Sequence, residues 1–295
     1  MKNVALVTGG TGFVGFHLCT WLMQNNYHVI ATGRKSENKP PCNELYTNEL
    51  NEFPHEKHSD ISVCFHLAAN NNTLDSDVDS MIESNVNVPI TLFQNLLQQN
   101  NCKNFVYASS CSVYGNQPAP FVEDITETRP LNPYAVSKLE FEKRANNFAE
   151  ENSVRTIGLR YSNVYGPKEG HKEKRASMIH QLIEKISLRQ EVCLFENGQQ
   201  LRDWVFVDDV VKANVKAMSL GCTGIYNVGY GKPYSFNYLV EIISRMMHRF
   251  VKIKYIPCDF TQSYQNHTAV DLTKSTRELK WEPEISVPEG IRMMI

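Results

Sequence analysis

The chain has 295 residues, of which 42% are hydrophobic, and its formal net charge is −2 at pH 7. This hydrophobic share is enough for a full core, and a nearly neutral chain lacks the basic surface that nucleic-acid binding requires. No apolar run approaches the roughly 18 residues that span a bilayer, and the first residues reach glycines too early for a signal peptide. We therefore expect a cytoplasmic protein that binds neither nucleic acid nor membrane.

The eight cysteines are scattered along the chain and form no Cys-x-x-Cys or Cys/His spacing. This distribution argues against a zinc site and against a disulfide framework. We expect most of these thiols to be apolar fillers of the core, and no bound metal.

The N-terminal residues have a strand–turn–helix order. The apolar run Val4–Thr8 predicts a strand and Phe16–Gln24 predicts a helix, and between them lies Gly9-Gly10-Thr11-Gly12-Phe13-Val14-Gly15. Glycines allow a tight turn and a close approach of the backbone to a pyrophosphate, which the positive end of the helix attracts. The order of these elements favours a dinucleotide site over an ordinary turn.

The second predicted strand, Tyr27–Thr32, ends in residues that favour NADP over NAD. An NAD-binding chain has an acidic residue about 20 positions into this unit, which binds the ribose 2′-hydroxyl. Here Gly33 is followed by Arg34 and Lys35, and the Arg34 guanidinium matches the geometry of a 2′-phosphate. NAD is the alternative, since a solvated Arg-Lys pair after a strand is also common.

The next segments continue a parallel α/β alternation. Strands are expected at Val63–Ala69, Asn104–Ser109 and Thr156–Leu159, and helices at Met81–Gln98 and Tyr134–Glu150. The alternation predicts an α/β fold with a doubly wound parallel sheet, spanning residues 1–165.

Beyond residue 165 the predicted elements are shorter. They are a basic loop at Pro167–Arg175, helices at Met178–Arg189 and Asn237–His248, and a strand at Asp203–Val207. We expect residues 166–295 to form mainly a smaller substrate-binding lobe over the carboxyl ends of the strands, with some later segments returning to the sheet.

A serine, a tyrosine and a lysine between these elements indicate a chemistry. Asn132 and Pro133 are a typical helix start, so Tyr134 and Lys138 would share one helix face. An ammonium within about 4–6 Å lowers the pKa of a phenol from its usual value near 10, and the Ser110 hydroxyl can hydrogen-bond the reacting oxygen. The set predicts hydride transfer at a hydroxyl-bearing carbon, the alternative for Tyr134 and Lys138 being an exposed helix pair.

Six stretches together resemble the extended short-chain dehydrogenases/reductases of the nucleotide-sugar epimerase and dehydratase group. They are Thr8-Gly-Gly-Thr-Gly-Phe-Val-Gly15, His66-Leu-Ala-Ala69, Tyr107-Ala-Ser-Ser-Cys-Ser-Val-Tyr-Gly115, Tyr134-Ala-Val-Ser-Lys138, Leu159-Arg-Tyr-Ser-Asn-Val-Tyr-Gly-Pro167 and Arg202-Asp-Trp-Val-Phe-Val-Asp-Asp209. The resemblance covers nearly the whole chain. It implies a Rossmann fold, a nucleotide-diphosphate sugar as substrate and a homodimer.

The resemblance also implies which residues form the site. Its catalytic residues would be Ser110, Tyr134 and Lys138. The cofactor would contact Tyr134 and Lys138 together with Gly9, Thr11, Gly12, Phe13, Val14, Gly15, Arg34, Lys35, Leu67, Ala68, Ala69, Asn85, Tyr161 and Val164. The substrate would contact Ser112, Asn163, Lys172, Arg202, Tyr264 and Asp271.

Within the group the chain is similar to ADP-glycero-manno-heptose 6-epimerases. Two stretches carry this likeness, Tyr165-Gly-Pro-Lys-Glu-Gly-His-Lys172 and the segment from Tyr255 to Leu272. The likeness implies that Lys172 is a second catalytic base on the other face of a keto intermediate. The alternative is a lysine that contacts phosphate or solvent in a charged loop.

Cys111 and Ser112 stand where 4,6-dehydratases of this group have an Asp-Glu pair, so an ordinary 4,6-dehydratase is not expected. The Cys111 thiol could act as an acid, or it could be a small residue packed beneath the sugar. We expect a nucleotide-sugar epimerase with tightly bound NADP. The alternatives are a nucleotide-sugar dehydratase or ketoreductase with Cys111 as acid, and an inactive NADP-sensing binding protein.

Overall fold

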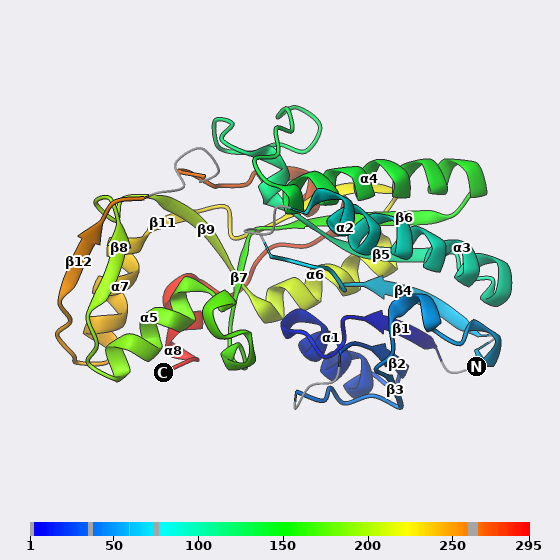
Figure 1. Ribbon diagram of the computed structural model, residues 1–295, viewed down its shortest axis with the longest axis horizontal. Helices are drawn as coiled ribbons and strands as arrows, with labels where there is room; N and C mark the ends of the chain where they lie inside the picture. The colour runs from blue at the N-terminus through cyan, green and yellow to red at the C-terminus, as the bar shows by residue number, and fades with distance from the viewer. Residues whose placement is uncertain (1–2, 35–37, 59, 73–76, 259–264) are drawn as a thin grey trace.

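Seven parallel strands form the central sheet, in the order β10-β6-β5-β4-β1-β2-β3 (Figure 1). All five residues of the central strand β1 are buried, as expected where helices cover both faces of a sheet. The predicted doubly wound parallel sheet is confirmed. The strands are β1 (Val4–Thr8), β2 (His28–Thr32), β3 (Glu44–Tyr46), β4 (Ile61–His66), β5 (Asn104–Ser110), β6 (Arg155–Tyr161) and β10 (Gly224–Val228).

The computed structural model describes residues 3–34, 38–58, 60–72, 77–258 and 265–295. Two predicted site residues, Lys35 and Tyr264, lie outside these ranges.

Helices cover both faces of the sheet (Figure 1). Helices α1 (Phe13–Gln24) and α6 (Val207–Leu220) pack together on one face, around a core that includes Leu18 and Val210. Helices α3 (Val88–Asn100) and α4 (Pro133–Asn152) lie on the other face. The carboxyl ends of β1, β4, β5 and β6 therefore meet at one edge between two helical layers.

A smaller lobe lies beyond this edge (Figure 1). Its strands form a sheet of three and a sheet of two, and its own apolar core contains Leu182, Leu239 and Ile291. Its elements are β7 (Asn163–Tyr165), α5 (Met178–Ser187), β8 (Val192–Phe195), β9 (Leu201–Phe206), β11 (Pro233–Ser235), α7 (Phe236–Met246), β12 (Ile253–Ile256) and α8 (Val287–Arg292). Strand β10 is part of the large sheet and helix α6 packs against it, although both follow residue 165. The division at that residue stays a prediction.

Two elements differ from their predicted form. The helix expected at Met81–Gln98 is divided into α2 (Val78–Ile82), a π-helical turn at Glu83–Asn87 and α3. A search for a 3.6-residue period does not detect a π turn. The strand expected at Asp203–Val207 ends at Phe206, because Val207 begins α6, whose acidic first turn is a typical helix start.

Asp203 joins the smaller lobe to the edge of the large sheet. Its side chain is fully buried and accepts hydrogen bonds from the backbone N–H groups of Tyr230 (2.6 Å), Gly231 (2.9 Å) and Val270 (3.2 Å). The Ser162 hydroxyl donates a fourth bond of 3.3 Å. One carboxylate therefore orders the turn after β10 and the segment that leads to Asp271.

We expect Asp203→Ala to lower the free energy of unfolding by about 3 kcal/mol or more, because it removes the charged acceptor of three backbone N–H groups. Chemical denaturation monitored by circular dichroism measures this. The control is Asp208→Ala, since the side chain of Asp208 is 48% exposed and contributes about 0.3–1 kcal/mol at a helix start. Equal losses in the two variants would contradict the role given to Asp203.

Candidate active site

The turn between β1 and α1 is a cradle that only glycines can form. Gly9 has a φ of +70°, and a Cβ atom there would lie 2.7 Å from the backbone nitrogen of Ala68. A Cβ at Gly15 would overlap the Gly9 carbonyl oxygen. Gly12 is the N-cap of α1 and has no side chain to occupy the first N–H groups of the helix. These features fit a pyrophosphate held by backbone N–H groups.

The same cradle is fixed to the end of β4. The Thr8 hydroxyl accepts hydrogen bonds from the N–H groups of Leu67 and Ala68, both 3.2 Å long. It also lies 2.8 Å from Nδ1 of His66, whose pKa is lowered to about 3 by burial and by the charge of Lys138. A neutral histidine at this position leaves the dinucleotide site without an extra fixed charge.

Asn85 supports the loop that follows β4. Its buried amide accepts from the Asn70 N–H at 2.7 Å and donates to the Asn70 carbonyl oxygen and to the Ser137 hydroxyl. The π turn places this side chain toward the loop. Contact between Asn85 or the adjacent Ala69 and a cofactor stays a prediction.

The end of β2 lies over the glycine turn. The Gly10 N–H donates to the Thr32 carbonyl oxygen at 2.8 Å, and Gly33 lies so close to Thr11 that a Cβ there would overlap its side chain. Arg34 follows and is exposed. Arg34 therefore follows directly on the residues that contact the glycine turn, and its contact with a cofactor stays a prediction.

Ser110, Tyr134 and Lys138 lie together at the carboxyl end of β5. Asn132 is the N-cap of α4 and accepts the Ala135 N–H at 2.9 Å, so the predicted helix start is correct. Ser110 ends β5 and its hydroxyl hydrogen-bonds the Tyr134 phenol, while the Lys138 ammonium lies 5.8 Å from the centre of the Tyr134 ring. The two hydroxyls can therefore face one substrate oxygen, with the ammonium near the phenol ring.

Burial sets the protonation of this group. It raises the pKa of Tyr134 to about 12, although Ser110 acts in the opposite direction, and it lowers the pKa of Lys138 to about 8. Lys138 is 3% exposed and donates to the Ala108 carbonyl oxygen at 2.8 Å. The phenol therefore needs positive charge beside it to ionise at neutral pH, and only the phenolate can accept a proton.

Cys111 and Ser112 differ in what they offer a ligand. The Cys111 thiol is buried and donates to the Arg160 carbonyl oxygen at 3.3 Å, and burial raises its pKa well above the usual value. This environment favours a packed small residue over an acid. The Ser112 hydroxyl is buried without a hydrogen-bond partner among the described residues, as expected of a group that binds a substrate.

The predicted residues of β6 and β7 have structural partners. The hydroxyl of Tyr161 exchanges hydrogen bonds with the Asn214 amide of α6, in the core of the large lobe. The Asn163 amide donates to the Asp203 carbonyl oxygen at 2.8 Å, and Val164 packs between the cores of the two lobes. Their contacts with cofactor or substrate stay predictions.

Lys172 belongs to an ordered loop beside α1. Its ammonium lies 2.8 Å from a carboxylate oxygen of Glu169 and 4.8 Å from the centre of the Phe13 ring. Glu169 is fully buried and also accepts from the N–H and hydroxyl of Ser177 at 2.7 Å. The ion pair engages Lys172 as a cation, which favours a charge contact over the role of a base.

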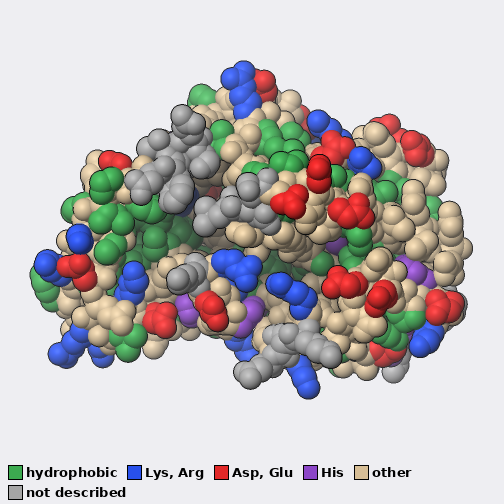
Figure 2. Space-filling model, in the orientation of Figure 1, with side chains coloured by type: hydrophobic (Ala, Val, Ile, Leu, Met, Phe, Trp, Pro, Cys, Tyr) green, Lys and Arg blue, Asp and Glu red, His purple; other side chains and the backbone are tan. Residues whose placement is uncertain are grey.

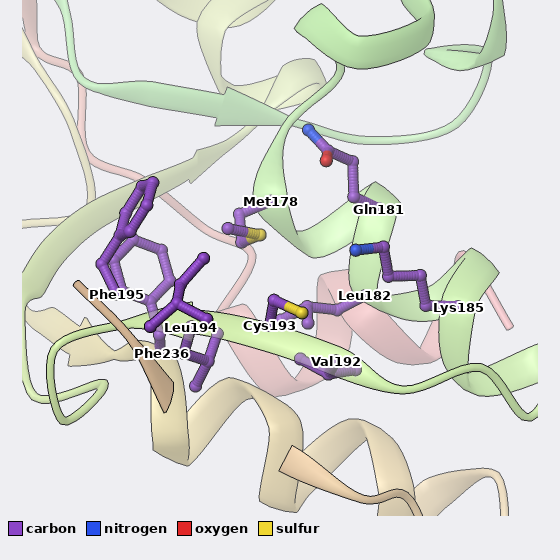
Figure 3. Close-up of a pocket in the computed structure, with 10 residues that line it drawn as sticks. Met178, Gln181, Leu182, Lys185, Val192, Cys193, Leu194, Phe195 and Phe236 are labelled. Atoms are coloured by element: carbon purple, nitrogen blue, oxygen red, sulfur yellow. The ribbon is translucent and has the colours of Figure 1, made fainter. Parts of the chain in front are cut away.

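The smaller lobe has a cavity of about 250 Å³ (Figure 3). Gln181 and Lys185 of α5 lie on one side and the Phe195 and Phe236 rings on the other. The cavity does not include the Ser110–Tyr134–Lys138 group. It is lined by Met178, Gln181, Leu182, Lys185, Val192, Cys193, Leu194, Phe195, Phe236 and Ile256.

Arg202 of β9 lies beside one of the rings that line this cavity. The guanidinium carbon is 5.7 Å from the centre of the Phe236 ring, and Nη1 donates to the Leu201 carbonyl oxygen at 3.0 Å. In the space-filling view, basic side chains lie near the middle of the face and acidic ones gather over the larger lobe (Figure 2). A buried arginine beside an aromatic cavity suits a phosphorylated ligand with a flat ring.

The family model that describes the NAD dependent epimerase/dehydratase family matches residues 5–229. The chain belongs to this family. It is 32% identical over 98% of its length, and over 96% of the relative, to a Methanocaldococcus jannaschii protein provisionally named a UDP-glucose 4-epimerase.

Two solved structures of the epimerase/dehydratase family have the same fold. A Thermotoga maritima UDP-glucose 4-epimerase with UDP-glucose is 28% identical, with a TM-score of 0.91, and the match covers 99% of this chain and 97% of that one. A Helicobacter pylori ADP-L-glycero-D-manno-heptose-6-epimerase is 33% identical, with a TM-score of 0.87, covering 99% and 94%. The predicted family is confirmed, and with it the prediction that the chain is an enzyme.

Within this epimerase/dehydratase chain, sequence reasoning missed the cavity of the smaller lobe, because its lining comes from four separate elements, α5, β8, α7 and β12. It also missed the carboxylates Glu142, Glu169 and Asp203. The only sequence signal was a carboxylate within an otherwise apolar stretch, as at Asp203 before Trp204. No helix in the described part of the chain combines the length and apolarity needed to cross a membrane.

We expect Gly15→Ala to abolish retention of the nicotinamide cofactor, because its Cβ would displace the Gly9 carbonyl oxygen and close the cradle. The cofactor content of the purified protein, released by heat and quantified by absorbance, measures this. Gly170→Ala is the control, since a Cβ at Gly170 meets nothing within 4 Å. Full cofactor content in Gly15→Ala would show that the cradle is not the binding site.

Proposed function

We propose that the protein is a nucleotide-sugar epimerase that oxidises a sugar carbinol transiently and reduces it again on the opposite face. The observation that carries the proposal is the placement of Ser110, Tyr134 and Lys138 on the same sheet edge as the glycine cradle. When bound, the nicotinamide cofactor supplies the acceptor and donor of hydride. Net redox is zero, so no external reductant is consumed.

The proposed proton transfer uses the burial of the group. Tyr134 removes the proton from the sugar hydroxyl, and the Ser110 hydroxyl stabilises the oxygen as it becomes a carbonyl. Because the pKa of Tyr134 is raised to about 12, its phenolate depends on Lys138 and on any further positive charge at the site. Returning the proton from Tyr134 completes the cycle after the sugar has presented its other face.

The substrate is proposed to lie across the two lobes. Arg202 would hold the diphosphate, and the cavity lined by Phe195 and Phe236 would hold the nucleotide. Ser112, whose buried hydroxyl has no partner in the described chain, would contact the sugar. Asn163 and Asp271 are kept as substrate contacts, because both lie on segments ordered by Asp203.

The relatives act on both UDP-sugars and ADP-heptose, as their names state. We therefore place the substrate in the class of nucleotide-diphosphate sugars. The heptose 6-epimerase likeness of the Lys172 loop supports a second role for that residue. Its ion pair with Glu169 favours contact with a substrate phosphate or carbonyl oxygen over proton abstraction.

NADP is the proposed cofactor, with NAD as the alternative that the family description names. Arg34 is exposed at the end of β2, where an NAD-binding chain has a carboxylate. A homodimer in the cytoplasm is proposed as well. Exposed apolar side chains on α2 and α4, Val78 and Val136, support that association.

The two alternative functions have less support. A dehydratase or ketoreductase with Cys111 as acid requires a free thiol proton, and that thiol donates its hydrogen bond to the Arg160 carbonyl oxygen. An inactive NADP-sensing protein has no need for Ser110, Tyr134 and Lys138 at one end of the sheet. The first alternative gives a different product and the second gives none, so one experiment separates all three functions.

Incubation with a panel of UDP- and ADP-sugars in deuterated water, without added cofactor, tests the function by NMR and mass spectrometry. We expect a stereoisomer of unchanged mass. Tyr134→Phe should lower kcat by about 10²–10⁴-fold, because the proton acceptor is lost. Tyr27→Phe, a tyrosine at the opposite end of the sheet, is the control. Loss of water, or net oxidation of cofactor, would move the protein to the first alternative, and inertness toward every sugar to the second.

Arg34→Glu tests the cofactor. We expect the ratio of NADP to NAD affinity to fall by about 100-fold, since a charge-assisted contact worth about 1.5–3 kcal/mol is replaced by repulsion. Titration of the apoprotein with each dinucleotide, followed by fluorescence, measures the ratio. Arg129→Glu, an exposed arginine in a loop, is the control. An unchanged ratio would remove the support for NADP.

A further inference from the structure

A buried ion pair lies directly behind the Ser110–Tyr134–Lys138 group. The Glu142 carboxylate accepts from Nε and Nη2 of Arg160 at 2.9 and 2.7 Å, and from the Ser109 hydroxyl at 2.5 Å. All three residues are at most 5% exposed. Removing a charged pair from water costs free energy, so we expect a function of this pair beyond stability.

The topology places this carboxylate at the junction of three elements. Ser109 of β5 is the register partner of Arg160 of β6, and Glu142 reaches both from α4. Glu142 lies one helical turn after Lys138 and two after Tyr134, on the same face of α4. The carboxylate therefore fixes the helix that carries Tyr134 to the strand end that carries Ser110.

Glu142 also acts on the charge of Lys138. Burial lowers the pKa of Lys138 to about 8 and the attraction of Glu142 opposes that change. His66, the neighbour from β4, is neutral because burial lowers its pKa to about 3. The other ionisable groups nearby are Tyr134 on α4, Tyr107 on β5, Cys111 after β5 and Arg160 on β6. Glu142 is the carboxylate whose attraction acts on Lys138, while Asp203 and Glu123 also act on Cys111.

We propose that Glu142 is a positioning residue, which holds Ser110, Tyr134 and Lys138 in register and keeps the Lys138 ammonium charged, with Arg160 as the counterion that limits the effect. Its part in catalysis rests on the proposed function. Arg160 is held by more than the ion pair, since its guanidinium lies 4.7 Å from the centre of the Tyr114 ring. Tyr114 in turn donates to Asn227 at 2.8 Å.

The two charges predict opposite changes, which a purely structural pair would not produce. Glu142→Gln leaves the Arg160 cation unpaired near Lys138, so the ammonium should lose its proton at lower pH. Arg160→Met leaves the Glu142 carboxylate unpaired, so the ammonium should persist to higher pH. The double variant removes both charges and should bring the titration back toward that of the wild type.

The test is a 13C NMR titration of protein labelled at the lysine Cε, with the Lys138 resonance assigned by comparison with Lys138→Met. We expect the midpoint near pH 8 in the wild type to fall by about 1 pH unit or more in Glu142→Gln and to rise in Arg160→Met. Glu140→Gln is the control and should leave it unchanged, because this half-buried glutamate, two residues earlier on α4, pairs with Arg144. Shifts in the same direction, or none, would overturn the proposal.

Kinetics tests the catalytic part of the proposal. The alkaline limb of the kcat profile should move with the NMR midpoint in each variant, while KM stays within about twofold, because Glu142 does not touch the substrate. If Arg160→Met does not fold, the wild type, Glu142→Gln and the double variant still give a shift and its rescue. If the wild type turns over no nucleotide sugar, the proposed function fails, and the NMR titration still decides the electrostatic role of Glu142.

Discussion

The site depends on how closely the turn after β1 approaches the backbone after β4. At Gly9 the two backbones are so near that a single methyl group would lie 2.7 Å from the Ala68 nitrogen. Thr8 closes the contact by accepting both N–H groups that follow β4. This approach holds the ends of β1 and β4 together, and β5 pairs with β4 beside them. The start of α1, the Asn85-supported loop and the Ser110 hydroxyl can then face a common ligand.

Three buried carboxylates fix the segments around these strand ends, and each has a different set of hydrogen-bond donors. Asp203 accepts backbone N–H groups and orders the smaller lobe, while Glu169 orders the loop of Lys172 by accepting from Ser177. Glu142 is paired with Arg160. A carboxylate bonded to N–H groups of the backbone acts mainly on chain geometry. A carboxylate paired with a side-chain cation also sets the local field, and its net effect depends on where that cation stands.

The fold was largely readable from the sequence because parallel strands are continuous apolar runs and α4 begins with an unambiguous Asn132-Pro133 cap. The glycine turn and the Tyr134–Lys138 pair were readable for the same reason, since short-range spacing determines them. Ser110 was readable as the residue that ends an apolar strand. What could not be read depends on distant pairing. The cavity around Phe195 and Phe236 draws on four elements of the smaller lobe, and the partner of Glu142 lies 18 residues away, on strand β6. The π turn at Asn85 was not predicted, because it changes the helical period over only a few residues.

The separation of the cavity from the reacting group bears on how an epimerase can work. Reduction on the opposite face requires the sugar to turn over while the substrate stays bound. A nucleotide held in the apolar cavity and a diphosphate held by Arg202 would supply binding energy from parts of the substrate that do not react. The sugar itself then needs few strong contacts, and the described groups near Tyr134 offer few, chiefly the hydroxyls of Ser110 and Ser112. We therefore propose weak contacts at the sugar and strong ones at the nucleotide diphosphate, with Arg202 and the aromatic residues of the cavity supplying the strong ones.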